Sequence, residues 1–346
     1  MRRLLLICFL VTIFLGITIG VNAKYMWSAG TTGEGSTGYV AIGILSEIVN
    51  TYAGKGEDIF MSPVSYTTSL VGLKAFDQKE VVSMYSDALQ LGQIINREGV
   101  YSPKYYEWSA PFAQMMWMYD IDYFFIIRKK DADKIKSWSD FANRSMFPQM
   151  RGTGGYEVCK LIFGPDGLNI WDTIDEKTFE RSHAADALKL KEVDVVFAYS
   201  SGGVIVGYAQ EVLSRTDSMV VEITPEELEK VLKAASFLSA KIIDPDYYMG
   251  QDVGLTKPLK VPVQSFVNIV NPDIPEEIVY QVVKAAFENA TEMARTVQVW
   301  ANFSKDPWGY NLPLLLKHKK MGIAIHPGAL RYFRELGHDT KILGLE

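Results

Sequence analysis

Few side chains in this sequence have the types and spacing that catalysis requires. Four histidines stand at positions 183, 318, 326 and 338, and none of them has a metal-binding spacing such as H-E-x-x-H. The Ser-Ser-Gly-Gly run that begins at Ser200 lacks the preceding glycine of a nucleophile elbow. We therefore expect a protein that is not an enzyme, with no catalytic residue, no metal site and no cofactor.

A glycine-rich segment is the strongest candidate for binding chemistry. Gly33, Gly35 and Gly38 form a G-x-G-x-x-G pattern in "SAGTTGEGSTGYVAIGILSEIVN", between an apolar run and a helix-like run. This pattern fits a dinucleotide site, which keeps an exported nucleotide-binding oxidoreductase as one alternative. The N-terminus of any helix also presents unpaired N–H groups and partial positive charge, so the same turn could bind another small anion.

The N-terminus predicts export. Arg2 and Arg3 precede an apolar run over residues 4–21, and "VNA" before Lys24 offers small residues for cleavage. We expect residues 1–23 to be a signal peptide or a retained N-terminal anchor, with the rest in the periplasm or on the extracellular face. After cleavage only Cys159 remains, within the apolar run "YEVCKLIF", where we expect a buried thiol and no disulfide.

Charge and patterning indicate a folded α/β protein. The formal net charge of -6 gives no basic surface for nucleic acid. Strand-like and helix-like segments alternate, which is typical of parallel sheets covered by helices. Small or polar residues should lie at the N-termini of the helices. They are the Gly-rich turn at residues 33–38, Ser62 or Ser65 at a Ser-Pro turn, and Asp87 in "YSDALQ".

The second half repeats this arrangement. A long aromatic strand, "QMMWMYDIDYFFIIRKK", is predicted to be buried and to pass from one domain into the next. The segments "FPQMRGTGGYEVCKLIFG" and "EVDVVFAYSSGGVIVGYAQEVL" each predict a strand, a small-residue turn and a helix. In "EITPEELEKV", Thr224 should cap a helix, with Pro225 at its first position and Glu227 completing a capping box.

The order of these motifs resembles the TAXI-type solute-binding proteins of TRAP (tripartite ATP-independent periplasmic) transporters. The resemblance covers "GTTGEGSTGYVAIGILSEIVN", "GTGGYEV", "VVFAYSSGGV" and, most specifically, "IAIHPGALRYFRELG" over residues 323–337. The segment "DFANRSMFPQM" departs from the family's Asp-Leu-x-Gly-Lys step. Because of that departure, the resemblance implies the family's fold for this chain more strongly than it implies the family's ligands.

The resemblance implies a type II periplasmic-binding-protein-like fold, in which two α/β lobes enclose a ligand cleft. We expect lobe one to comprise residues 24–125 and 261–346, and lobe two residues 126–260. The implied function is to capture a dicarboxylate or amino acid by cleft closure and to deliver it, as a monomer, to an integral-membrane TRAP permease. A membrane-anchored sensory or scaffold module with the same fold is the other alternative. We expect His326 to be structural and to fix the C-terminal helix on lobe one.

The same reasoning predicts four walls of a carboxylate site, held mainly by helix N-termini. Arg151 is included as a charge partner for the carboxylate. The predicted ligand-binding residues are Gly33, Ser36, Thr37 and Tyr39 on the first wall, Ser65 and Thr67 on the second, Arg151, Thr153, Gly154, Gly155 and Tyr156 on the third, and Ser201 and Gly202 on the fourth.

Overall fold

The computed structural model describes residues 24–34, 36–53, 59–151, 153–235, 237–243 and 258–346. The signal peptide or anchor predicted for residues 1–23 lies outside these ranges, as does Gly35. Within the described ranges, no helix has both the length and the apolar character needed to cross a membrane.

The first lobe begins with three parallel strands, each followed by a helix. The strands are β1 (Tyr25–Thr31), β2 (Ile59–Ser65) and β3 (Ser83–Asp87), in the order β2-β1-β3. The helices are α2 (Thr37–Tyr52), α3 (Ser69–Asp77) and α4 (Ala88–Asn96). Because the strands are parallel, the N-termini of all three helices lie at one edge of the sheet, as the sequence predicts.

The predicted cap of the second helix is wrong. Ser62, Pro63 and Ser65 all belong to strand β2, and the N-cap of α3 is Thr68, whose Oγ1 accepts from the N–H of Val71 over 3.3 Å. A proline is tolerated here because β2 is the edge strand, so its missing N–H breaks no ladder on the open side.

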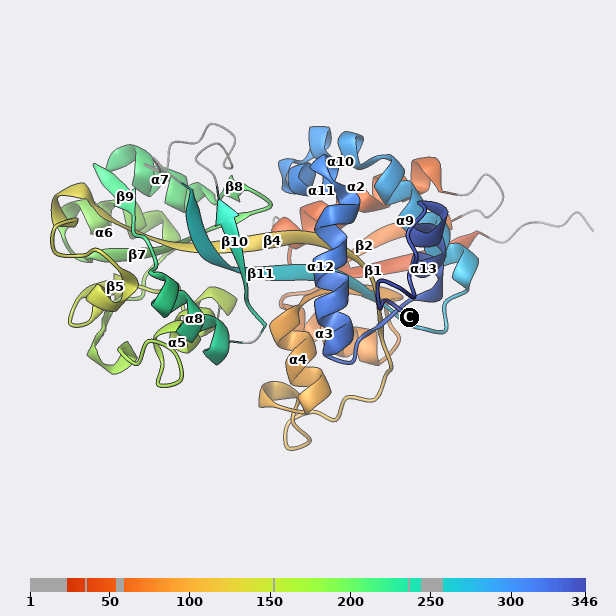
Figure 1. The fold of residues 1–346 in the computed structure, drawn as a ribbon, viewed down its shortest axis with the longest axis horizontal. Helices are drawn as coiled ribbons and strands as arrows, with labels where there is room; N and C mark the ends of the chain where they lie inside the picture. The colour runs from red at the N-terminus through yellow and green to blue at the C-terminus, as the bar shows by residue number, and fades with distance from the viewer. Residues whose placement is uncertain (1–23, 35, 54–58, 152, 236, 244–257) are drawn as a thin grey trace, which may run out of the picture.

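Two long antiparallel strands connect the lobes. Strand β4 (Ala113–Arg128) pairs with β11 (Leu259–Val270), and β11 also pairs with β3. Figure 1 shows these two strands running side by side between two groups of elements. The aromatic run of β4 is buried, as predicted. The sheet is therefore continuous across the molecule, in the order β2-β1-β3-β11-β4-β7-β5-β6.

The second lobe is built on the other half of that sheet. Its strands are β5 (Ser145–Phe147), β6 (Asp175–Glu176), β7 (Val195–Ser201), β8 (Val204–Ile205), β9 (Ser218–Val220) and β10 (Ser239–Ile243). Its helices are α5 (Gly154–Phe163), α6 (Ala184–Leu190), α7 (Gly207–Arg215) and α8 (Pro225–Ala234). The capping box of α8 has the predicted members, with Thr224 as the cap and Glu227 as its partner.

The turn after β7 differs from the prediction. It does not open a helix, because Gly202 and Gly203 connect β7 to β8 as a two-residue hairpin loop. Their φ angles of 60° and 87° lie in the left-handed region that such a loop requires. Helix α7 begins only after β8, at Gly207.

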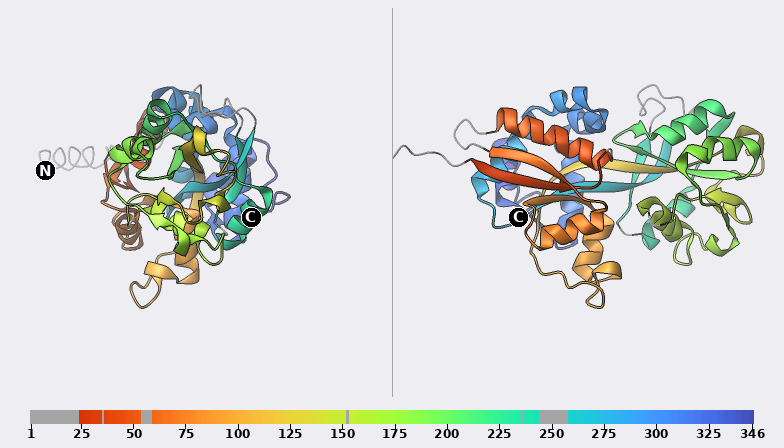
Figure 2. Two further views of the ribbon diagram at one scale, coloured as in Figure 1. Left: turned by 90° about the vertical axis from the view of Figure 1, so that its left-hand side faces the viewer. Right: turned by 180° about the vertical axis from the view of Figure 1, so that it is seen from behind.

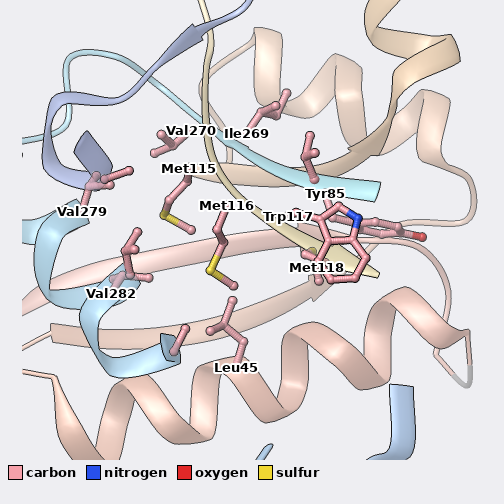
Figure 3. Packing of buried hydrophobic residues seen from close by; sticks show 14 of the residues in the cluster. Leu45, Tyr85, Met115, Met116, Trp117, Met118, Ile269, Val270, Val279 and Val282 are labelled. Carbon is pink, nitrogen blue, oxygen red and sulfur yellow. The ribbon is translucent and has the colours of Figure 1, made fainter. Parts of the chain in front are cut away.

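Each half of the molecule has its own hydrophobic core. Helices α2 and α9 (Glu276–Glu288) pack with Met116 and Trp117 of β4 in the first lobe, and Figure 3 shows this packing. Aromatic residues such as Phe125, Trp138 and Phe163 fill the second lobe, where Cys159 is buried as predicted. The prediction of two α/β lobes is confirmed, while the boundaries near residues 125 and 260 stay predictions.

The C-terminal segment returns to the first lobe. It contains β12 (Ala324–Ile325), α9, α10 (Ala290–Thr296), α11 (Ala301–Lys305), α12 (Pro307–Lys320) and α13 (Pro327–Glu335). Figure 2 shows the molecule from the end of the second lobe, with the first lobe behind it, and from the back. His326 caps α13: its Nδ1 accepts from the N–H of Gly328, and its Nε2 lies 3.1 Å from the carbonyl oxygen of Ile274. These contacts fix the last helix to the first lobe.

Candidate functional site

One face of the continuous sheet gathers polar and aromatic side chains where the lobes meet. Directly paired residues share a face because side chains alternate along each strand. Phe266 is paired with both Asp87 and Tyr119, and Tyr123 is paired with Tyr199. We call this side of the sheet the phenol face. Its polar members are Tyr85, Asp87, Tyr119, Tyr123, Tyr199, Ser201 and Gln264.

The first lobe ties its helix N-terminus to this face through hydroxyl groups. The Oγ1 of Thr32 lies 2.7 Å from both the Tyr85 hydroxyl and the Ser36 Oγ. Ser36 in turn caps α2 by accepting from the N–H of Tyr39 over 3.1 Å. Burial raises the pKa of Tyr85 to about 12, so its phenol stays protonated and can donate a hydrogen bond.

The last glycine of the G-x-G-x-x-G pattern has a steric role here. A Cβ atom on Gly38 would lie 2.2 Å from the Cζ of Tyr85. Only glycine therefore lets the phenol lie against the first turn of α2. The pattern serves close packing of a tyrosine at this point.

Asp87 places a carboxyl group on the same face. It caps α4 by accepting from the N–H of Gln90 over 2.9 Å, and it also accepts from the Gln264 side chain. The Oε1 of Gln264 accepts from the Tyr123 hydroxyl. Burial raises the pKa of Asp87 to about 6, against the hydrogen bonds that lower it. The carboxyl group is thus ionised at neutral pH but closer to protonation than an exposed aspartate.

The second lobe adds a chain of hydrogen bonds that ends in an arginine. The rings of Tyr199 and Tyr208 lie 6.2 Å apart, edge to face. The Tyr208 hydroxyl donates to the carbonyl of Phe197 over 2.8 Å and accepts from the Nε2 of Gln149. The Oε1 of Gln149 accepts from the Nε of Arg181 over 2.8 Å. This chain fixes the direction of the Arg181 side chain.

Arg181 differs from the buried Arg128 of the same lobe in its partners. Its guanidinium lies 5.9 Å from the ring centre of Tyr208 and forms no ion pair with any residue in the described ranges. Arg128, by contrast, is paired with Asp131 and Asp194. A half-buried guanidinium without a carboxylate partner is suited to bind a carboxylate from outside the protein.

The backbone of Gln149 is strained. Its φ angle is 102°, which residues other than glycine seldom adopt, and its side chain is fully buried. Strain of this kind persists only where surrounding contacts hold it, and it is concentrated at functional sites.

The predicted first wall lies near the phenol face, and the second is more open. Ser36 caps α2, while Gly33, Thr37 and Tyr39 are half-buried around that cap. Ser65 and Thr67 are exposed at the end of β2 and in the turn after it. The structure thus brings the first wall next to Tyr85.

On the predicted third wall, Arg151 and Tyr156 are directed to a protein carboxylate. The Arg151 Nε lies 2.8 Å from Glu176, and the Tyr156 hydroxyl donates to the same carboxylate over 3.0 Å. Thr153 caps α5 and Gly154 is exposed. A Cβ on Gly155 would lie 3.0 Å from the ring of Phe197, which is two residues from Tyr199 on β7, so this glycine lies on the phenol-face side of the sheet.

The predicted fourth wall reaches the lobe junction. Ser201 is paired with Ile121 of β4, so it lies on the phenol face, and its buried Oγ has no hydrogen-bond partner among the described residues. The N–H of Gly202 donates to the carbonyl of Asp120 over 2.9 Å. A Cβ on Gly202 would lie 2.2 Å from the carbonyl oxygen of Val299, in the first lobe.

Sequence reasoning missed most of the phenol face. The sequence favoured a core position for Tyr119 and Tyr123 over a pocket lining, and the pairing of strands distant in sequence is what places them at the junction. The alternation in "MYDIDYF" was the available signal, since it separates tyrosines from aspartates. The other residues missed are Tyr85, Gln149, Arg181, Tyr199, Tyr208 and Gln264.

The site has no arrangement of ligands for a metal. No group of three or more His, Cys, Asp or Glu side chains that could hold an ion occurs in the described ranges. What the site offers instead is a guanidinium, a carboxyl group and several neutral hydroxyl donors.

Comparison with known proteins assigns the chain to a family. The model of the NMT1-like family matches residues 29–337. The chain belongs to the NMT1-like family. For this NMT1-like protein, the assignment supports the sequence-based prediction of a solute-binding protein of a transport system and not of an enzyme. The finer resemblance to the TAXI type stays a prediction.

Solved structures with similarity to this NMT1-like protein include two binding proteins. The periplasmic aliphatic sulphonate binding protein SsuA from Escherichia coli has 10% sequence identity and a TM-score of 0.40, over 90% of this chain and 83% of SsuA. MatC from Rhodopseudomonas palustris with bound malate has 15% identity and a TM-score of 0.46, over 80% of this chain and 89% of MatC.

Proposed function

We propose that this protein is an exported solute-binding protein that captures a small carboxylate between its lobes and delivers it to a TRAP-type permease. The observation that carries the proposal is Arg181, a half-buried guanidinium that forms no ion pair in the described ranges and is oriented by Gln149 beside the phenol face. The resemblance to TAXI-type proteins supports the choice of permease.

The ligand carboxylate is held by donors from both lobes. Arg181 supplies charge, and the Ser201 Oγ is a buried hydroxyl without a partner among the described residues. The first lobe supplies the Tyr85 phenol and the N-terminus of α2. The residues predicted from the sequence at the starts of α2 and α5 form the outer parts of this proposed site.

Asp87 makes an amino acid a better ligand than a dicarboxylate. Its carboxyl group lies on the same face of the sheet and is ionised at neutral pH. It would attract an ammonium group and repel a second carboxylate. An α-amino acid offers a carboxylate for Arg181 and an ammonium group for Asp87.

Cleft closure couples binding to recognition by the permease. The hairpin at Gly202 contacts the backbone of Val299 across the lobe junction. A ligand that contacts both lobes stabilises the form in which they meet, and the permease then binds that form.

A thermal-shift screen of the chain from Lys24 onward tests this function. The panel comprises amino acids, monocarboxylates, dicarboxylates and NAD, each with wild-type protein and Arg181→Met. A ligand at about a thousand times its dissociation constant adds roughly 4 kcal/mol to the free energy of unfolding. We expect at least one amino acid to raise the midpoint of the wild type, and to raise that of Arg181→Met by clearly less. Stabilisation by NAD alone, or by no carboxylate, contradicts the proposal.

The permease is tested separately, by uptake of the identified ligand into vesicles that contain a TRAP permease from the same genome. We expect uptake only when the binding protein is added. If a sensor protein binds the loaded form and no TRAP permease responds to it, the transport role is wrong.

A further inference from the structure

A cavity lies on the opposite side of the connecting strands from the phenol face. It has a volume of about 240 Å³. Asp120 and Ser265 line it and are paired with each other, and they alternate with the residues of the phenol face along β4 and β11. Figure 1 shows α12 lying across these two strands, and this helix forms the outer wall. The cavity is therefore separate from the proposed carboxylate site.

Both lobes contribute to the cavity. Helix α12 provides Tyr310, Leu314 and Lys317, while β10 provides Ala240 and Lys241. The ring of Trp117, on β4, lies tilted against that of Tyr310, with ring centres 4.0 Å apart. The walls are thus partly aromatic and aliphatic, with charged groups between them.

Charged groups from both lobes line the cavity. Asp120 accepts from the Trp117 Nε1 over 3.0 Å and from the Ser265 Oγ over 2.7 Å, and it lies 3.3 Å from the Nζ of Lys241. Asp120 and Lys241 therefore form an ion pair inside the cavity. Lys317 is a second cation in the same cavity, and it forms no ion pair within the described ranges.

Lys317 is held by neutral oxygens only. Its Nζ donates to the carbonyls of Phe237 and Leu238 and to the Ser239 Oγ, each over 2.9 Å. Burial lowers the pKa of Lys317 to about 8, which leaves it mainly protonated at neutral pH. A positive charge so placed lowers the cost of bringing an anion into the cavity.

We propose that this cavity binds a small monocarboxylate with a short apolar tail. Its volume is about eight times the ~30 Å³ that one water molecule occupies in the liquid, which limits the ligand to about eight non-hydrogen atoms. The carboxylate lies toward Lys317, where it replaces one of the three neutral acceptors of the Nζ, and the tail packs against Leu314 and Val263. Because the walls come from both lobes, the bound anion also bridges them.

Isothermal titration calorimetry of the full chain tests the site with butyrate and benzoate. Their amides, butyramide and benzamide, serve as neutral controls. We expect saturable binding of at least one carboxylate, and at least tenfold weaker binding of its amide. Absence of saturable binding, or equal binding of amide and carboxylate, overturns the proposal.

Four variants locate the binding. Lys317→Met removes the charge, and Ala240→Phe fills the cavity while keeping Lys317; each should weaken binding at least tenfold. Lys320→Met, at the exposed end of the same helix, is the control that should bind as the wild type does, and Arg181→Met removes the proposed carboxylate site on the other side of the sheet. If Arg181→Met abolishes binding and Lys317→Met does not, the carboxylate occupies the phenol face. That result supports the proposed function and overturns the second site.

Discussion

The Nε of Arg181 donates a hydrogen bond to the Oε1 of Gln149 over 2.8 Å, and Gln149 holds this position with a φ angle of 102°. A strained, fully buried amide thus orients a guanidinium that has no carboxylate partner in the described ranges. The positive φ angle of Gln149 costs conformational free energy, and the contacts of its side chain hold it in place. An oriented cation of this kind is the feature on which the proposed function depends.

Arg181→Met should weaken binding of the ligand found in the thermal-shift screen by about 10- to 150-fold. A hydrogen bond to a charged group contributes roughly 1.5–3 kcal/mol, which corresponds to that range. The midpoint of unfolding without ligand should also fall modestly, because the Oε1 of the buried Gln149 loses its hydrogen-bond donor. Calorimetric titration measures the affinity, and Arg295→Met, which alters an exposed arginine of α10, is the control. Equal losses in both variants would show that Arg181 acts only through net charge.

Gln149→Gly and Gln149→Ala should separate strain from hydrogen bonding. Both variants remove the bonds to Arg181 and Tyr208, so both should lower ligand affinity. Glycine adopts a positive φ freely and alanine does not, so Gln149→Gly should be more stable than Gln149→Ala by about 1–2 kcal/mol. Denaturant unfolding measures the difference. Equal stability of the two variants would mean that position 149 carries no strain.

Asp87→Asn should change how stability depends on pH. The pKa of Asp87 is raised to about 6 in the folded protein from an ordinary 3.8, so the folded state binds more protons between these values. The contribution of the protonated Asp87 carboxyl group to the free energy of unfolding is complete below about pH 4 and is lost as the pH rises through 6. Two pKa units correspond to about 3 kcal/mol. Asparagine still caps α4, so Asp87→Asn should match the wild type near pH 4 and exceed it near pH 7.

Unfolding by urea at a series of pH values measures this effect. Asp133→Asn, at an exposed aspartate, is the matched control and should follow the wild type throughout. A stability difference between Asp87→Asn and the wild type that is constant from pH 4 to 7 would contradict the assignment.

Gly202→Ala should hinder contact between the lobes. The new Cβ would lie 2.2 Å from the Val299 carbonyl oxygen, and alanine at a φ of 60° costs a further ~1–2 kcal/mol. We expect a larger radius of gyration with ligand present, measured by small-angle X-ray scattering, and weaker binding. Gly207→Ala is the control, because no atom lies within 4 Å of a Cβ at that position. A compact Gly202→Ala complex would show that the hairpin does not limit closure.

The fold was predictable where local patterns decide it. Small residues before apolar helical runs located the starts of α2 and α8, because capping depends on neighbours in sequence. The Ser-Pro segment was wrongly predicted to be a turn. A proline is accepted inside an edge strand, and the local sequence does not reveal that β2 lies at the edge of the sheet. The two glycines after Ser201 were wrongly predicted to lead directly into a helix, because the two-residue strand β8 before α7 has no clear sequence pattern.

The candidate site was less predictable because it depends on pairing between distant strands. Tyr85, Tyr119 and Tyr199 come from three strands, and only the register of β11 and β7 with β4 brings them to one face. Arg181 showed no motif at all, and its significance comes from what surrounds it. In the sequence, Arg151 stood out more than Arg181 because it is next to the glycine turn. The structure pairs the charge of Arg151 with Glu176.

A crystal structure with the best ligand of the thermal-shift screen is the most direct test of the central claim. We predict an amino acid or carboxylate between the lobes, with its carboxylate within hydrogen-bonding distance of Arg181 and its other end toward the phenol face. Ligand density only in the cavity beside Lys317, or a nucleotide at the N-terminus of α2, would contradict the account.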